Sequence, residues 1–293
     1  MSQNLSQDPL KRLFAEHSRH WQDNLYVYPV ISRRSGGLSI GVNLNPDKAC
    51  NFDCVYCQVD RTQRPMVRKV EPDVLGSELE AMVRQALSGE LFDDLRFAEV
   101  PAAYRKIRDI AFSGDGEPTI CPQFPAAVHV AAEVRRAYQL HDVKLLLLTD
   151  AAYLNKPIVA EALAEMDANN GEIWAKLDAG TEDYFRRINR SNVSLQTILD
   201  NLLEASRVRP LVIQSLWMVV DGEPPPPAEV EAFSQRLADM IARGGRFKMV
   251  QVYTIARHPA ESFVSPLNPG QIEAVAARIR AKVDIPLETY GGG

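Results

Sequence analysis

The sequence predicts an α/β protein whose main body is a partial (β/α)6 barrel. Between residues 38 and 281, short apolar segments that suit buried strands alternate with amphipathic segments that suit helices. This alternation favours a parallel sheet with right-handed crossovers, and it repeats about six times, fewer than the eight units of a closed barrel. A doubly wound open sheet fits the same alternation and stays open as the alternative. With 293 residues, 46% of them hydrophobic, the chain is long enough for one large core.

The chain is expected to begin with an N-terminal extension, residues 1–37. A short helix is predicted over Pro9–Trp21. The segment that follows is expected to be interrupted at Pro29 and at the Gly36-Gly37 pair, because proline removes a backbone donor and glycine favours turns.

The barrel itself is expected over residues 38–256. Its strands are predicted where short apolar runs occur: Leu38–Leu44, Ile107–Ser113, Lys144–Thr149, Glu172–Asp178, Leu211–Val220 and Met249–Ile255. Its helices are predicted where apolar residues recur at helical spacing: Pro72–Ser88, Phe124–Tyr138, Lys156–Met166, Glu182–Ile188, Leu195–Ser206 and Glu229–Ala242. A last helix, Pro269–Ala281, belongs to a C-terminal segment, residues 257–293, which is expected to pack on the barrel.

The charge and hydropathy of the chain limit its surroundings. Its net charge is −5, which disfavours broad, non-specific binding of nucleic acid but leaves room for a local basic patch. The first 25 residues are polar, and the longest apolar runs, Leu145–Leu148 and Leu211–Val220, are too short for a membrane span. Four cysteines kept as thiols fit a reducing compartment. We therefore expect a cytoplasmic protein with no membrane partner.

Three of the four cysteines fall within one short segment, as Cys50, Cys54 and Cys57 in a C-x3-C-x2-C pattern. Thiolate is a soft ligand that suits iron–sulfur clusters, zinc and Cu(I). A [4Fe–4S] cluster normally takes four thiolates. Three thiolates from one loop would leave one iron without a protein ligand, so that this iron could bind a small molecule.

Structural zinc is the main alternative for the three cysteines. A closed zinc site needs four ligands, and the fourth cysteine, Cys121, is isolated in the sequence. The histidines are scattered, at His17, His20, His129, His141 and His258. A distant histidine that completes a zinc site stays open as an alternative. A disulfide pair is not expected, because three thiols are an odd number and no secretory segment is seen before them.

A second candidate loop follows the second predicted strand, in the stretch Gly114-Asp115-Gly116-Glu117. Its glycines allow close approach of the backbone, and its carbonyls and Glu117 could meet an ammonium group. A simple turn into a helix is the alternative. In α/β barrels the active site lies at the C-terminal ends of the strands, which is where both this loop and the cysteine loop are expected.

These two loops resemble the motifs of the radical S-adenosylmethionine (SAM) superfamily. The cysteine spacing matches, with the aromatic Tyr56 before the last cysteine, and Asp115–Pro118 corresponds to the Gly-Gly-Glu-Pro motif with its first glycine replaced by aspartate. The resemblance covers roughly residues 38–256 and implies the same partial barrel. It implies that Cys50, Cys54 and Cys57 hold a [4Fe–4S] cluster and that SAM chelates the fourth iron.

The resemblance also implies the roles of the surrounding residues. Gly114, Asp115, Gly116 and Glu117 would hold the methionine amino group of SAM, and Tyr56 would lie beside the adenine. A flavodoxin- or ferredoxin-like donor would reduce the cluster, and cleavage of SAM would give a 5′-deoxyadenosyl radical. A metal- or cluster-bearing binding module without SAM turnover is the alternative function. The Glu117 loop favours the enzyme, because a structural metal site needs no loop that binds an amine.

Several further stretches resemble the wyosine-synthase-like branch, which is related to a tRNA-modifying enzyme. They are Ser32-Arg33-Arg34, residues 174–180 and residues 187–190. Wyosine synthases carry a second cluster on three further cysteines, and with only Cys121 left this chain is not expected to build it. The branch implies a tRNA or another phosphate-bearing substrate. Six arginines could form a phosphate-reading rim, with an ordinary solvated surface as the alternative: Arg61, Arg64, Arg68, Arg186, Arg187 and Arg190.

Lys176 and Asp178 end one predicted strand, and one of the two is expected to face the barrel interior. In wyosine relatives a lysine is thought to form a Schiff base with a keto acid, but we favour a Lys176–Asp178 pair or a partner for the SAM carboxylate.

Polar residues also occur within or at the ends of other predicted strands. Gln214 and Gln251 lie mid-strand and could contact SAM or substrate, or could be core amides with satisfied hydrogen bonds. Thr149 and Asp150, at a strand end, could likewise contact SAM or substrate, or could be core groups with satisfied hydrogen bonds.

Overall fold

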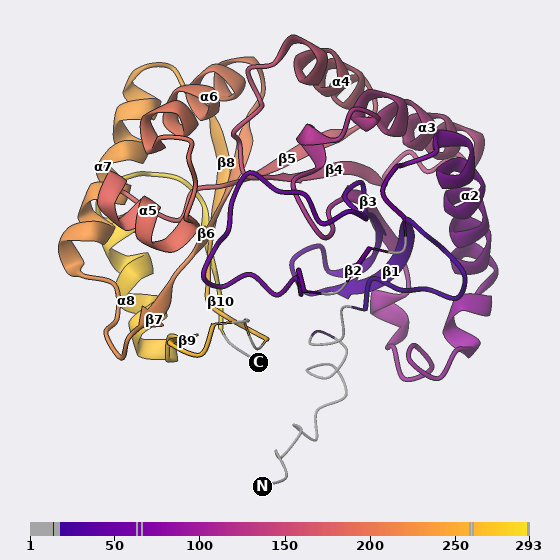
Figure 1. The fold of residues 1–293 in the computed structure, drawn as a ribbon, viewed down its shortest axis with the longest axis horizontal. Coiled ribbons are helices and arrows are strands. Elements are labelled where there is room, and N and C mark those ends of the chain that lie inside the picture. Colours follow the sequence, from indigo (N-terminus) through magenta and orange to yellow (C-terminus); the bar gives the residue numbers. More distant parts are fainter. Residues whose placement is uncertain are drawn as a thin grey trace, which may run out of the picture.

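The protein is a partial (β/α)6 barrel, as the sequence predicts, with helices around the outside of a curved and mostly parallel sheet (Figure 1). The computed structural model describes Phe14 and residues 18–62, 64–65, 67–257, 259 and 261–291. No helix in these ranges is long and apolar enough to cross a membrane.

The central sheet has eight strands, of which only the first is antiparallel to its neighbour. In spatial order they are β1 (Val27–Ser32), β2 (Gly37–Val42), β3 (Ile107–Phe112), β4 (Lys144–Thr149), β5 (Gly171–Lys176), β6 (Leu211–Leu216), β8 (Phe247–Tyr253) and β10 (Leu287–Tyr290). The register places Gln214 of β6 between Lys176 of β5 and Gln251 of β8. Polar side chains from three strands therefore share one level of the barrel.

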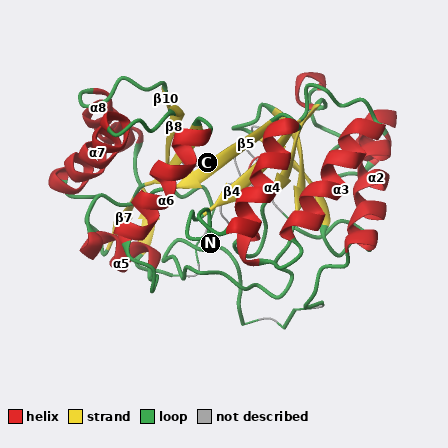
Figure 2. Cartoon of the chain, turned by 90° about the horizontal axis from the view of Figure 1, so that it is seen from above, coloured by secondary structure: helices red, strands yellow, loops and turns green. Residues whose placement is uncertain are grey.

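The helices cover the outer face of the sheet (Figure 2). They are α2 (Pro72–Ser88), α3 (Phe124–Ala137), α4 (Pro157–Ala168), α5 (Glu182–Asn189), α6 (Leu195–Val208), α7 (Pro227–Ala242) and α8 (Pro269–Arg280). Proline at the first turn starts α2, α3, α4, α7 and α8, where its missing N–H costs no helical hydrogen bond. The side chains of Thr181 and Ser194 cap the other two. Short 3-10 turns complete the set, at Glu90–Asp93, Ala102–Tyr104 and Pro118–Ile120.

Two apolar layers stabilise this arrangement. The larger one fills the space between the sheet and the helices, and its members include the fully buried Leu38, Ile110 and Phe233. The smaller one lies on the inner face of the sheet and takes one residue from each of four strands, Ala111, Leu146, Trp174 and Val212. Ala111, Leu146 and Trp174 of this inner layer also line the open space inside the barrel.

One predicted strand is wrong, because Leu211–Val220 is divided between two sheets. β6 ends at Leu216, and Met218–Val220 forms β7, which pairs with β9 (Val264–Pro266) outside the barrel. Trp217, between the two strands, is fully buried, and its ring packs edge-on against Phe233 of α7. An apolar run gives no sign of such a break, since both halves are buried.

The two edges of the sheet come from segments that the sequence placed outside the barrel. The predicted interruption at Pro29 is wrong, because Pro29 lies within β1, and an edge strand tolerates proline. β10 was not predicted and pairs with β8. Between these edges the Arg33 guanidinium stacks on the Tyr290 ring, 5.4 Å from its centroid, and donates to the Gly291 carbonyl at 3.1 Å.

The division of the chain at residues 37 and 257 stays a prediction, although the one sheet takes strands from all three segments. The predicted helix Pro9–Trp21 falls largely outside the described residues, and its described end, Ser18–Trp21, is not helical.

Candidate active site

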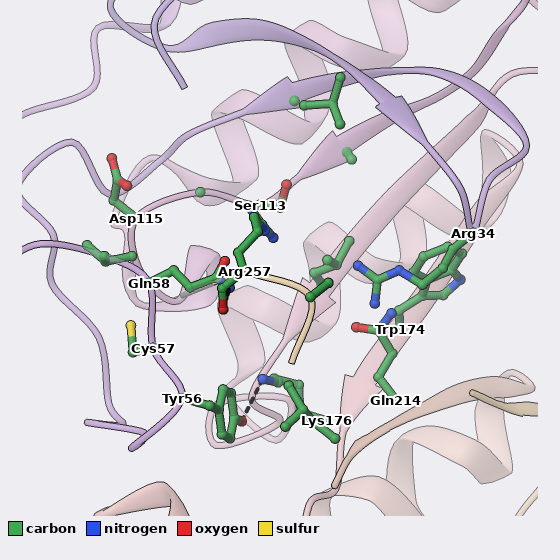
Figure 3. Close-up of a pocket in the computed structure, with 18 of the residues that line it drawn as sticks. Arg34, Tyr56, Cys57, Gln58, Ser113, Asp115, Trp174, Lys176, Gln214 and Arg257 are labelled. Carbon is green, nitrogen blue, oxygen red and sulfur yellow. Dashed lines mark hydrogen bonds between the residues drawn. The ribbon is translucent and has the colours of Figure 1, made fainter. Parts of the chain in front are cut away.

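A cavity of about 410 Å³ opens inside the barrel, at the C-terminal ends of the strands (Figure 3). The three clustered cysteines and the Gly114–Glu117 loop both line it, as do Tyr56, Lys176 and Gln214. The structure thus brings most of the sequence-predicted site residues to one space, although they come from four separate βα units.

The cysteine loop is held in place by the end of helix α5. The backbone N–H of Asp53 donates to the Asn189 carbonyl at 3.1 Å, and that of Val55 donates to the Ile188 carbonyl at 2.9 Å. Val55 and Ile188 are also buried in one apolar cluster. Sequence reasoning noticed residues 187–190 only as part of a resemblance and gave Asn189 no role, because the partners lie more than 130 residues apart.

All three thiols of the loop line the cavity, and Cys121 does not. Burial raises the pKa of Cys50 to about 12 and that of Cys54 to about 11. A metal binds the thiolate form, so a cationic cluster would offset the cost of burying these groups. Asn189 Nδ2 lies 3.5 Å from Cys54 Sγ as a hydrogen-bond donor. The donor set fits a [4Fe–4S] cluster with one iron open to the cavity.

A single metal ion fits the site less well than a cluster does. Among the residues that the structure describes, no three His, Cys, Asp or Glu side chains converge closely enough to hold one ion. Within the same residues no histidine lines the cavity. A cluster differs from one zinc ion in this respect, because each thiolate binds a different iron and the sulfur atoms need not converge on one point.

The Gly114–Glu117 loop approaches the cysteine loop so closely that a side chain at Gly116 could not fit. A Cβ atom there would lie 1.8 Å from the Ala49 carbonyl oxygen, which accepts a hydrogen bond from the Glu117 N–H at 3.3 Å. Glycine at this position therefore joins the two loops through their backbones.

Asp115, which stands where the family motif has glycine, has its charge satisfied locally. Arg19 forms an ion pair with it, and Asn43 Nδ2 donates to it at 2.7 Å. The Asp115 N–H in turn donates to Asn43 Oδ1 at 3.1 Å. The departure from the motif therefore attaches the N-terminal segment around Arg19 to the loop without placing an unpaired charge in the cavity.

Glu117 is only 3% exposed, and both of its carboxylate oxygens accept hydrogen bonds. Oε1 accepts from the hydroxyls of Thr119 at 2.6 Å and Thr149 at 2.8 Å, and Oε2 accepts from the Asp150 N–H at 2.7 Å. Burial still raises the pKa of Glu117, against the effect of these donors.

Asp150 lies beside Glu117, so that two carboxylates would repel each other in one buried region. Burial and the carboxylate of Glu117 raise the pKa of Asp150 well above its ordinary value. Its Oδ1 accepts from the Ala152 N–H at 2.9 Å, and the nearby Asn51 side chain opposes part of the rise in its pKa. Its buried Oδ2 makes no hydrogen bond of ordinary geometry within the described residues. Two adjacent buried carboxyl groups, one of them with an unsatisfied oxygen, fit a cationic ligand such as an ammonium group.

Lys176, Tyr56 and Asp178 form one hydrogen-bonded group, of which Figure 3 shows Lys176 and Tyr56. Lys176 Nζ donates to the Tyr56 hydroxyl at 2.7 Å, and this hydroxyl donates to Asp178. Lys176 Nζ lies 3.8 Å from Asp178 Oδ2 and 4.4 Å from the centroid of the Tyr56 ring. Lys176 lines the cavity, whereas the side chain of Asp178 is fully buried and accepts from the Leu216 N–H at 2.9 Å. One of the pair faces the interior, as expected.

Lys176 forms an ion pair with Asp178 in this structure. Burial alone lowers the pKa of this amine, but Tyr253, Asp178 and the nearby cysteines outweigh burial and raise it above its ordinary value. A Schiff base, the alternative role of Lys176, would require the neutral amine. Gln214 lines the cavity, where it could contact SAM or substrate, and its amide also donates to Gln251 at 2.9 Å within the core.

The six predicted rim arginines divide into two groups. Four of them pair with carboxylates, three at short distances and Arg61 at a longer one: Arg186 with Glu182 at 2.9 Å, Arg187 with Asp221 at 2.8 Å and Arg190 with Glu261 at 2.5 Å. Arg61 lies 3.7 Å from Asp53 and close to the Cys57 thiol. Arg64 and Arg68 are exposed, and neither forms an ion pair with a described residue.

A partial barrel with a three-cysteine loop at the C-terminal ends of its strands defines a class of barrel enzymes that use an iron–sulfur cluster. The chain belongs to the radical SAM superfamily, whose family model matches residues 44–233, and it is an enzyme of the radical SAM type. The superfamily implies a [4Fe–4S] cluster and SAM as cofactors.

Among curated proteins, the chain is 24% identical over 267 residues to a GTPase Obg of Brachyspira hyodysenteriae, covering 89% of this chain and 34% of that protein. It is 29% identical over 179 residues to a UPF0026 protein of Methanocaldococcus jannaschii, covering 60% and 46%. The matches thus span about a third to a half of these relatives. A structure of TYW1 with a lysine-pyruvate adduct bound has a TM-score of 0.50 at 15% identity, covering 93% of this chain and 81% of that one, and shows the same fold.

Proposed function

We propose that this enzyme holds one [4Fe–4S] cluster on Cys50, Cys54 and Cys57 and binds SAM at the remaining iron. One observation carries the proposal: the three thiols and the Glu117 loop open into one cavity, and the isolated Cys121 does not. When bound, the cluster and SAM supply a one-electron cleavage that yields a 5′-deoxyadenosyl radical, with a flavodoxin- or ferredoxin-like protein as the electron donor.

Glu117 and Asp150 would bind the ammonium group of SAM. Their carboxyl groups are buried side by side, and Asp150 Oδ2 makes no hydrogen bond of ordinary geometry among the described residues. A cation placed there would satisfy this oxygen and stabilise both carboxylates. The backbone of Gly114, Asp115 and Gly116 would line the same part of the site.

Tyr56 of the cysteine loop, together with Lys176 and Asp178 at the end of β5, would position SAM from another side of the cavity. Asp178 fixes the Tyr56 hydroxyl, which in turn receives a hydrogen bond from Lys176. The ring of Tyr56 would lie beside the adenine, and the ammonium group of Lys176 would meet the SAM carboxylate. Gln214 lies one strand further along and would supply a hydrogen bond to SAM or to the substrate.

The test compares cysteine variants after anaerobic reconstitution with iron and sulfide. Cys54→Ala should lose the cluster, and Cys121→Ala, the matched control, should keep it. Glu117→Ala should weaken SAM binding and leave the iron content unchanged. Under reducing conditions the wild-type enzyme should convert SAM to 5′-deoxyadenosine. Stoichiometric zinc without iron in protein from anaerobic cells, or a loaded cluster without SAM binding, would instead support the binding module.

We further propose that the substrate is a tRNA or another phosphate-bearing molecule. Arg64 and Arg68 follow the cluster loop, are exposed and form no ion pair with a described residue, so their charges are available to phosphates. In gel shifts with total tRNA, affinity should fall steeply with salt, because each phosphate contact releases counterions. Replacing Arg64 and Arg68 by Gln should reduce that slope more than replacing Arg186 and Arg187, which already pair with carboxylates. The absence of binding at low salt would exclude RNA.

A further inference from the structure

Arg34 reaches into the cavity from the turn between β1 and β2 (Figure 3). Its guanidinium carbon lies 5.5 Å from the centroid of a Trp174 ring and 5.1 Å from that of Tyr253. The two aromatic side chains belong to β5 and β8, so that strands on the far side of the sheet hold the guanidinium in place.

The edge of this guanidinium lacks a partner. Arg34 Nη1 is buried and forms no hydrogen bond within the described residues, where no carboxylate forms an ion pair with Arg34 either. Two aromatic contacts fix the group but do not satisfy its in-plane N–H donors. Such a planar fork matches the two oxygens of a carboxylate or a phosphate.

A second arginine of the same cavity, Arg257, also lacks an ion-pair partner in the described part of the chain. Burial, and then the charges of Arg19 and Arg34, lower the pKa of Arg257 to about 10. Arg19 is neutralised by Asp115, but Arg34 and Arg257 are not neutralised in this way. Two like charges held in one partly enclosed space favour an anion between them.

Arg34 lies away from the groups that would bind the SAM ammonium, and Arg257 lies between the two sides of the cavity (Figure 3). In Figure 3, Arg34 and Trp174 stand on one side of the cavity, and Cys57 and Asp115 stand on the other. The cavity is lined by two buried carboxyl groups, Glu117 and Asp150, and by two arginines without an ion-pair partner in the described residues, Arg34 and Arg257.

We propose that Arg34 and Arg257 form an oxyanion site that binds a carboxylate or phosphate group of the molecule on which the enzyme acts. This inference rests on the proposed function, because it assigns the remaining part of the same cavity to the substrate. The site would hold the anionic end of the substrate at a fixed distance from the cluster, so that a neutral group of similar size would bind poorly.

The test uses the anaerobically reconstituted enzyme without SAM and measures its thermal unfolding in inorganic phosphate, acetate and chloride at equal ionic strength. A ligand that binds only the folded state raises the unfolding temperature. Phosphate or acetate should raise the unfolding temperature above its value in chloride. The anion with the larger effect shows whether the site prefers a phosphate or a carboxylate group. R34Q and R257Q should weaken the response about tenfold in apparent affinity, the loss of one charge-assisted hydrogen bond. R34K should lose part of the response to the anion, and the exposed control R278Q should keep the full response.

Two results would overturn the inference. One is an equal response to phosphate, acetate and chloride, or an equal response in R34Q, R257Q and R278Q. The other is a loss of SAM affinity in R34Q and R257Q as large as the loss of anion affinity, which would assign both arginines to SAM. Production of 5′-deoxyadenosine is measured separately, so the oxyanion site can fail while the proposed function stands.

Discussion

At the scale of single residues, Asn189 connects most of the groups around the cysteine loop. Its side-chain amide donates to Asp178 at 3.1 Å, and it lies within 3.4 Å of the Tyr56 hydroxyl and 3.5 Å of Cys54 Sγ. Its own carbonyl accepts from the backbone of Asp53. One residue thus supports a cluster ligand, an aromatic side chain of the cavity and the backbone of the loop.

We expect Asn189→Ala to lower the free energy of unfolding by about 1–3 kcal/mol, because it leaves buried acceptors without their donor. It should also lower the iron content after anaerobic reconstitution, measured as iron per chain. The matched control is Asn192→Ala, three residues further on and exposed. Equal iron content in the two variants would show that the contact with Cys54 does not support the cluster.

The residues that sequence reasoning could predict are those with local signals. Cys50, Cys54 and Cys57 share one segment, and Glu117 stands between glycine and proline at a strand end. Asn189 and Arg34 stand in stretches whose only sequence signal is a family resemblance, because most of their partners lie more than 100 residues away in the chain. Only the folded barrel brings those partners together.

At the scale of elements, the two loops of the site depend on each other through Gly116. Replacing it by alanine would place a Cβ atom 1.8 Å from the Ala49 carbonyl oxygen, so the loops must separate. We expect Gly116→Ala to reduce both iron retention and SAM affinity and to lower stability by about 1–3 kcal/mol. In the control Gly76→Ala, within α2, the new atom meets only Val130, at 3.4 Å. A Gly116→Ala enzyme with normal iron and SAM binding would contradict this account.

Below the cavity, Glu172 of β5 joins three strands through its carboxylate. Lys144 of β4 contacts it at 2.9 Å, and Lys248 of β8 also forms an ion pair with it. Burial alone raises the pKa of Glu172, but hydrogen bonds from Lys248, Trp174 and Lys144 outweigh burial, so the pKa lies below its ordinary value. The carboxylate form is therefore favoured by folding.

The pH dependence of stability follows from the lowered pKa of Glu172. A carboxyl group whose pKa is lower in the folded state stabilises the protein above its unfolded pKa, about 4.3, and this contribution is lost as pH falls through the folded value. We expect Glu172→Gln to reduce the free energy of unfolding in urea by about 1–2 kcal/mol at neutral pH, with the difference from wild type shrinking toward pH 3. Glu133→Gln, which removes an exposed pair with Arg136, should have a much smaller effect. A difference that does not vary with pH would refute the role of the charge.

The helices and most strands could be predicted from periodicity, but the division at Trp217 could not. Both β6 and β7 are apolar, and the chain leaves the barrel between them because the Trp217 ring packs against α7. Similarly, Pro29 indicated an interruption, yet its strand lies at an edge where a missing donor is tolerated. Local patterns carry no information about which strands become edges.

At the scale of the whole molecule, the barrel is not closed by backbone pairing. In the described residues β1 and β10 are the two ends of the sheet, and side chains alone connect them. The sequence predicted about six units and therefore a partial barrel, but it did not predict which elements would flank the gap.

We expect Tyr290→Ala to increase amide hydrogen exchange in β1 and β10 and to leave β4 and β5 unchanged. The variant removes the ring on which Arg33 stacks, a contact worth about 0.5–1 kcal/mol, so local opening at these edges becomes more frequent. Tyr290→Phe keeps the ring and should exchange like the wild type. A uniform increase across the sheet would mean that the substitution weakens the whole fold instead.

The contact between Arg33 and Tyr290 also makes the barrel wall unequal in stiffness around its circumference. Everywhere else, spreading two neighbouring strands breaks a ladder of backbone hydrogen bonds. Spreading β1 from β10 breaks the stack of Arg33 on Tyr290, the bond to Gly291 and the contacts of Arg34 with Trp174 and Tyr253. Each stacked pair is worth about 0.5–1 kcal/mol, so these few contacts resist separation less than a ladder of backbone hydrogen bonds does. The barrel should therefore separate most easily between β1 and β10. On the other side of the barrel, the backbone ladder between β5 and β6 keeps Lys176 and Gln214 at a fixed spacing.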